Sequence, residues 1–184
     1  EMMRDVPPAI EGQRDGDRSH LGSNLIHDEA LLKTMYALAR SEGREEYATA
    51  ADCYLRRFAT HCAHTPTGIL PWGEHAYWQL VEDRVGNSNE WRGRTSPSTH
   101  DHLRQAPLWL LEKLYAFEPQ SVIRFGEGLD GHWTEGEPEE YIRHAYIEED
   151  RSYPRGDRSC DFPRHSGFYI FDWAFLYART GRED

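Results

Sequence analysis

The sequence of 184 residues has few cysteines, almost no lysine and no long apolar run. No stretch approaches the ~20 apolar residues of a membrane-spanning helix, so we expect no membrane partner. Its three cysteines, Cys53, Cys62 and Cys160, are odd in number and show no CxxC spacing, which argues against a disulfide framework or a zinc knuckle. No alternating strand pattern stands out, and the remaining pattern is helical.

Basic residues are also in deficit, because 32 acids against 21 bases give a net charge of -11. Binding to a nucleic-acid backbone needs a basic face, so nucleic acid is not expected as a partner. Lys33 and Lys113 are the only lysines, and all other bases are arginines. Genome composition is the simpler cause of this bias, and the planar fork with which arginine binds carboxylates is the functional one. An acidic sugar is therefore still open as a partner.

The chain divides into an N-terminal arm or loop, residues 1–22, rich in Asp, Arg, Gly and Pro, and one domain, residues 23–184. Apolar residues at helical spacing predict helices at 24–40, 47–58, 103–117, 120–125 and 167–179. The first two, joined by a short turn, predict an αα-hairpin. The segments 83–100, 126–138 and 150–163 are predicted as long loops, which in a helical scaffold are usually functional or disordered.

The turn after the first helix has an echo at the end of the chain. YALARSEGREEY (residues 36–47) and LYARTGRED (residues 176–184) share small and aromatic residues, then Arg, Ser or Thr, Gly and Arg-Glu. Two chance helix ends with a C-terminal glycine are the simpler explanation. A true repeat predicts an all-α fold of helical hairpins that forms part of an α/α toroid, an incomplete barrel truncated at its C-terminus. The remaining toroid helices would then be missing from this chain.

The stretch TGILPWGEHAYW (residues 67–78) is the clearest candidate site. It places Glu74 beside His75 and surrounds them with Trp72, Tyr77 and Trp78. Further histidines cluster with charged residues in HDH (100–102), in RH (143–144) and in RH (164–165). Two imidazoles and a carboxylate with open positions suit a divalent metal ion. Satisfied core or surface histidines, and aromatic rings packed in a helical core, are the alternatives to a metal site with sugar-stacking walls.

Four blocks carry a resemblance to a known family: GEHAYW (73–78), HDHLRQAPLW (100–109), YIRHA (141–145) and FPRHSGFYIFDWAFLYARTG (162–181). They resemble α/α-toroid polysaccharide lyases that act on pectate, most of all the exopolygalacturonate lyase family, over roughly residues 23–184. In that family two histidines and a glutamate bind a divalent metal such as Mn²⁺, Ni²⁺ or Zn²⁺, and an arginine beside the second histidine is the base.

The resemblance implies metal ligands at His75 and His144 and a base at Arg143. At the middle ligand, relatives read His-Glu-Leu-Lys where this chain reads Asp-His-Leu-Arg from Asp101, so either Asp101 or His102 takes that role. The family also has a later catalytic arginine, for which Arg164 is the candidate. Glu74, Trp72, Tyr77, Trp78 and His165 are the predicted substrate-binding residues.

The chemistry expected is β-elimination of a uronate, in which the C5 proton leaves after the adjacent carboxylate charge is neutralised by a metal ion or an arginine fork. Arg143 is either the base, with its pKa lowered by a nearby cation, or only a carboxylate-binding group. The alternatives to a lyase are a toroid hydrolase of uronyl oligosaccharides, using acids among Glu74, Asp101 and Asp172, and a non-catalytic sugar-binding helical fragment. A polysaccharide lyase would be expected in the periplasm or outside the cell.

Overall fold

The structure, a computed structural model, describes residues 22–23, 25–72, 75–80, 82–87, 100–102, 107–132, 134–135, 144–148, 153–154 and 163–183. Within these ranges it describes only the backbone of residues 100–102, 134–135, 144–145, 153–154 and 163–166. Gly22 is the only described residue of the predicted N-terminal arm, and it belongs to a strand.

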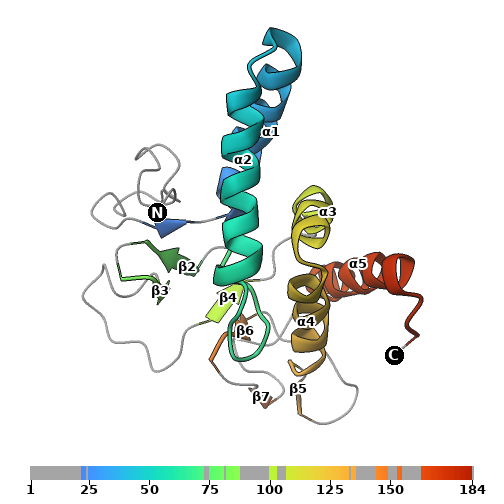
Figure 1. Cartoon of the computed structure of the whole chain (residues 1–184). Coiled ribbons are helices and arrows are strands. Elements are labelled where there is room, and N and C mark those ends of the chain that lie inside the picture. Colours follow the sequence, from blue (N-terminus) through green and yellow to red (C-terminus); the bar gives the residue numbers. More distant parts are fainter. Residues whose placement is uncertain are drawn as a thin grey trace.

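The described part of the chain is mainly helical, which confirms the fold class at that level (Figure 1). The helices are α1 (Leu25–Glu42), α2 (Glu45–Arg57), α3 (Leu108–Phe117), α4 (Pro119–Asp130) and α5 (Pro163–Thr180), and α2 continues into a π-helical turn, η3 (Phe58–Cys62). Each α-helix packs on the next described one along the chain, and η3 also contacts α3. This order is compatible with hairpins in series, and the toroid stays a prediction. None of the described helices is both long and apolar enough to cross a bilayer.

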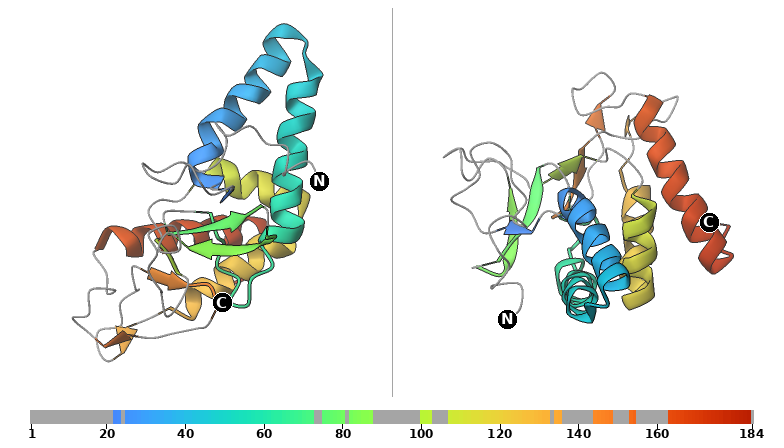
Figure 2. Two further views of the ribbon diagram at one scale, coloured as in Figure 1. Left: turned by 90° about the vertical axis from the view of Figure 1, so that its left-hand side faces the viewer. Right: turned by 90° about the horizontal axis from the view of Figure 1, so that it is seen from above.

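The predicted αα-hairpin is confirmed by α1 and α2, which project together beyond the rest of the molecule (Figures 1 and 2). Gly43 ends α1 with a φ of 66°, a left-handed conformation that favours glycine. Gly181 follows α5 with a φ of 70°, and its N–H donates to the Tyr177 carbonyl at 2.8 Å. The two copies of the turn motif therefore form the same kind of helix end, and a second hairpin stays a prediction.

Seven short strands in the described part of the chain were not foreseen from the sequence. β1 (Gly22–Ser23), β2 (Ala76–Gln79) and β3 (Arg84–Asn87) form an antiparallel sheet in that order. β4 (His100–His102) pairs antiparallel with β6 (His144–Tyr146), and β5 (Thr134–Glu135) pairs parallel with β7 (Tyr153–Pro154). Strands of two to four residues are too short to show a period of two, which is why the expectation of loops at 83–100, 126–138 and 150–163 was wrong in part.

Helix boundaries differ from the prediction most at α4. The sequence predicted a short helix at 120–125 followed by a loop, because Gly126 and Gly128 usually interrupt helices. In the structure α4 runs on to Asp130 through both glycines. A Cβ atom at Gly128 would lie 2.2 Å from the Thr67 carbonyl oxygen, and one at Gly68 2.2 Å from the Arg124 carbonyl oxygen. These glycines let the helix and the segment 65–69 approach each other more closely than side chains would allow.

The core lies where this segment, α3, α4 and the feet of α1 and α2 meet. Its largest fully buried side chains are Trp72, Tyr169, Phe58, Phe125, Leu25, Leu32, Leu55, Ile69, Leu70, Leu110, Leu111 and Leu114. A buried polar network also joins β1 to the hairpin, because the Tyr54 hydroxyl donates to Asp28 at 2.5 Å and contacts the Ser23 hydroxyl. Burial raises the pKa of Tyr54 well above its usual range, so it is a protonated donor here.

The contact between α4 and the segment 65–69 predicts an unusual response to an alanine. Replacing a glycine within a helix by alanine normally raises the free energy of unfolding by about 0.5–1 kcal/mol. We expect Gly128→Ala instead to lower the free energy of unfolding by about 1–3 kcal/mol, because the new methyl group meets a backbone oxygen. The measurement is denaturant unfolding, with Gly167→Ala in α5 as the matched control, since a Cβ there meets nothing within 4 Å. A Gly128→Ala protein as stable as the control would contradict this account.

Candidate functional site

Two of the predicted metal-binding segments lie side by side as the antiparallel ladder of β4 and β6. Its register places His102 opposite His144 and Asp101 opposite Ala145. Successive residues of a strand alternate between its two faces, so His102 and His144 share one face and Asp101 belongs to the other. The ladder thus distinguishes the two residues between which the sequence could not choose.

The backbone hydrogen bonds of Tyr146 define the kind of pair that the two histidines form. The Tyr146 N–H donates to His132 Nε2 at 2.9 Å, and the Tyr146 carbonyl accepts from Thr67 Oγ1 at 2.8 Å, so both groups are turned away from β4. Backbone groups alternate along a strand, and those of His144, two residues earlier, are therefore turned the same way. By register, His102 and His144 form a non-hydrogen-bonded pair, the kind in which Cα atoms are about 4.5 Å apart.

The segment that leads to His75 is fastened to the same strand. The Thr67 N–H donates to the Ile147 carbonyl at 3.3 Å, and Thr67 Oγ1 also lies 3.0 Å from that oxygen. Arg124 of α4 donates to the Thr65 carbonyl at 2.7 Å. His75 lies eight residues beyond Thr67, half-buried, in the bend directly before β2. Hydrogen bonds therefore connect the segment 65–69, which precedes His75 in the chain, to the end of β6 and to Ile147 directly after it.

The aromatic residues of the candidate stretch are core residues in this structure. Trp72 is 1% exposed and packs edge-on against Phe125, with ring centroids 4.9 Å apart. Tyr77 and Trp78 are 8% and 9% exposed, within β2. The expectation that these rings form open walls for sugar stacking is not supported, because buried positions leave no free ring face. Of the two alternatives stated from the sequence, packing in the core describes all three.

A carboxylate that the sequence did not single out closes the turn between β2 and β3. Asp83 Oδ1 accepts from Trp78 Nε1 at 3.0 Å, contacts His61 Nε2 at 2.9 Å and lies 3.4 Å from Arg57 Nη2. The Trp78 N–H, followed by His61 and Arg57, lowers the pKa of Asp83. Asp83 also has a φ of 54°, in the left-handed region. This network attaches the small sheet to the end of α2 and η3, and so supports the strand that follows His75.

Several predicted site residues cannot be placed with their side chains. Glu74 and Arg143 lie outside the described residues. Arg164 and His165 belong to the first turn of α5, where the structure describes only the backbone. Their proposed roles stay predictions.

No three His, Cys, Asp or Glu side chains among those that the structure describes are grouped so as to hold a metal ion. The side chains of residues 101, 102 and 144 do not belong to that set, because only their backbone is described. What the structure contributes to the metal question is thus the backbone register of β4 and β6 and the hydrogen bonds around it.

Comparisons with known proteins give no family. No family model matches the sequence, and a search of curated proteins finds no match. The resemblance to pectate lyases therefore stays a prediction.

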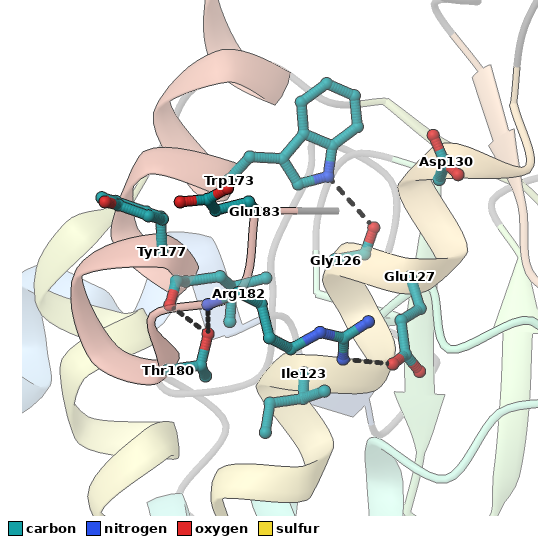
Figure 3. A pocket seen from close by; sticks show the side chains of 10 residues that line it. Ile123, Gly126, Glu127, Asp130, Trp173, Tyr177, Thr180, Arg182 and Glu183 are labelled. Atoms are coloured by element: carbon teal, nitrogen blue, oxygen red, sulfur yellow. Dashed lines mark hydrogen bonds and ion pairs between the residues drawn. The ribbon is translucent and has the colours of Figure 1, made fainter.

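A separate cavity of about 360 Å³ lies between α4 and α5 (Figure 3). Trp173 Nε1 donates to the Gly126 carbonyl at 3.2 Å on one side, and Arg182 forms an ion pair with Glu127 at 2.7 Å on the other. None of the predicted site residues lines this cavity. The polar contacts at its edges link α4 to α5 and to the residues after α5, and the cavity is separate from the β4–β6 ladder.

Asp172 of α5, a candidate acid in the hydrolase alternative, is 3% exposed, and its Oδ1 has no hydrogen-bond partner among the described residues. Burial raises the pKa of this carboxyl well above its usual range. The folded state therefore keeps a proton at pH values where the unfolded chain, with a pKa of about 3.9, has lost it. The stability that this provides is complete below that pH and is lost as the pH rises towards the folded pKa.

We accordingly expect Asp172→Asn to be more stable than the wild type at neutral pH, with the difference shrinking as the pH is lowered to about 4. The slope of the difference is at most about 1.4 kcal/mol per pH unit. Thermal or denaturant unfolding from pH 4 to pH 8 measures it, with Asp130→Asn, an exposed carboxyl of α4, as control. A difference that is independent of pH would show that the Asp172 carboxyl is ionised in the folded protein.

Proposed function

We propose that the protein is a polysaccharide lyase that cleaves pectate or a related uronate polymer by metal-assisted β-elimination. The observation that carries the proposal is the register of β4 and β6, which sets His102 directly opposite His144. Two segments of the family resemblance are thereby adjacent in space, although they are distant in sequence. The hydrogen bonds from Thr67 to β6 add the segment before His75 to the same neighbourhood.

His75, His102 and His144 are the proposed ligand set: the register supports His102 and His144, and the family resemblance implies His75. His102 and His144 are opposite each other on one face of the ladder as a non-hydrogen-bonded pair, whereas Asp101 belongs to the opposite face. A site of three neutral imidazoles suits Ni²⁺ or Zn²⁺ better than Mn²⁺. In the Irving–Williams order a nitrogen site binds Mn²⁺ more weakly than Ni²⁺ or Zn²⁺, and the carboxylate that suits Mn²⁺ is replaced here by an imidazole. A bound cation would act as a Lewis acid on the substrate carboxylate.

The residues of this chain would perform the proton chemistry. Arg143, next to His144 in sequence, would take the C5 proton of the uronate. The C4–O bond then breaks, a C4–C5 double bond forms, and the departing oxygen takes a proton from water. An arginine, with a free pKa above ~12, can act as a base only where a neighbouring cation and burial lower that value. A metal ion held by the adjacent His144 would supply such a cation.

The ligand set is tested by metal content together with product formation. We expect His102→Ala and His144→Ala to lose bound Ni²⁺ or Zn²⁺, with metal affinity reduced by more than about 100-fold. Even the loss of a residue that only hydrogen-bonds to a metal ligand lowers the affinity by about 10–100-fold. Asp101→Asn, one residue away on the other face, is the matched control and should bind metal as the wild type does. The lyase assay is the ultraviolet absorbance of the new C4–C5 double bond on polygalacturonate.

Three outcomes would count against the proposal. Metal loss in Asp101→Asn with retention in His102→Ala would exchange the ligand. Activity that survives a chelator would remove the metal from the mechanism. A wild-type protein that releases sugar without the ultraviolet chromophore would be a hydrolase instead.

Arg143→Ala separates a base from a carboxylate-binding group. If Arg143 is the base, kcat falls by about 10²–10⁴ while KM and metal content stay close to wild type. If the arginine only binds substrate, KM rises and carries most of the effect. Initial rates over a range of polygalacturonate concentrations distinguish the two.

A further inference from the structure

His132 is a fully buried histidine that the sequence did not single out, two residues beyond the end of α4. Its Nδ1 lies 2.6 Å from the Gly128 carbonyl oxygen, which can only accept, so Nδ1 carries the proton. Its Nε2 accepts from the Tyr146 N–H at 2.9 Å and is therefore unprotonated. The Tyr146 carbonyl lies farther from Nε2, at 3.2 Å, and has a donor of its own in Thr67. His132 is thus a neutral imidazole that bridges α4 and β6.

Thr67 forms a second hydrogen bond to the backbone of Tyr146, at its carbonyl group. Its hydroxyl is within 2.8 Å of the Tyr146 carbonyl and 3.0 Å of the Ile147 carbonyl. Both backbone polar groups of Tyr146 are therefore satisfied by residues outside the β4–β6 ladder. An exposed strand edge offers such groups to any partner, and here the edge is covered by His132 and Thr67.

The ladder needs such support because it is small. A two-stranded ladder is marginally stable by itself, and β4 and β6 are three residues each. A slip of one residue would move His144 to the other face and away from His102. We propose that His132 and Thr67 are positioning residues, which fix β6 in the register that sets His144 opposite His102. This inference rests on the proposed function only for its catalytic meaning.

Two substitutions of His132 separate its two hydrogen bonds. Asparagine places its amide nitrogen near the position of Nδ1, so His132→Asn keeps the bond to Gly128 and loses the bond to Tyr146. Glutamine reaches as far as Nε2 with its amide oxygen, so His132→Gln keeps the bond to Tyr146 and loses the bond to Gly128. Both variants lose one buried hydrogen bond, and a merely structural role would affect them alike.

The first readout is the strand register, which needs no metal. In a non-hydrogen-bonded antiparallel pair the two Hα atoms are in close contact, and NMR detects them as a strong nuclear Overhauser effect. We expect this signal between residues 102 and 144 in the wild type and in His132→Gln, and its loss in His132→Asn. Measurements are made well below the unfolding midpoint of each variant. A signal that persists unchanged in His132→Asn, or that is lost equally in both variants, would overturn the proposal.

The second readout connects the register to the metal site. Co²⁺ is titrated into each protein and followed by its d–d absorption. The expected result is an affinity 10–100-fold weaker for His132→Asn and near wild type for His132→Gln, as for residues that orient a ligand. Thr67→Val should act like His132→Asn, and Thr67→Ser, which keeps the hydroxyl, like the wild type.

The two readouts fail separately. If the wild-type protein binds no Co²⁺ while the Hα contact depends on His132 as described, the positioning role holds and the proposed function is wrong. Equal Co²⁺ affinity in the wild type and in His132→Asn, with binding in both, would leave the metal site standing and reject the positioning role.

Discussion

The close approach of α4 to the segment 65–69 is the constraint on which the candidate site depends. Two glycines without side chains, at 68 and 128, allow each backbone to lie against the other, and Arg124 fixes the contact with a hydrogen bond to Thr65. The end of α4 then presents His132 to β6, while Thr67 reaches the same strand. A wider separation between α4 and the segment 65–69 would break the hydrogen bonds of His132 and Thr67 to Tyr146. Hydrogen bonds tolerate changes in donor–acceptor distance of only a few tenths of an ångström.

The candidate site therefore stands on short strands that are held by a helical scaffold, and the helices themselves supply few of the predicted residues. Trp72 and Trp78 illustrate the division of roles. Both belong to the candidate stretch 67–78, yet Trp72 packs against Phe125 and Trp78 donates to Asp83. Their burial fixes the chain on either side of His75, which is a supporting role.

Periodicity predicted the helices well because each buries a stripe against its neighbours. It failed where the same residue type can serve opposite purposes. Gly126 and Gly128 suggested the end of a helix, and here they lie inside one, where Gly128 lets the Thr67 backbone approach α4 closely. The strands were not predicted for another reason. Two to four residues contain no measurable period, and strand pairing joins segments that are distant in sequence.

The sequence by itself determined the mainly helical class, the αα-hairpin with its glycine end, and the residue types that a metal site would use. It could not choose between Asp101 and His102, because adjacent residues differ only in the face to which a strand assigns them. Tertiary structure assigns the two residues to opposite faces of β4 through the register with β6, and which of them is a ligand stays a prediction. It alone also revealed His132, whose partners are backbone groups that become neighbours only after folding, and which therefore leaves no motif in the sequence.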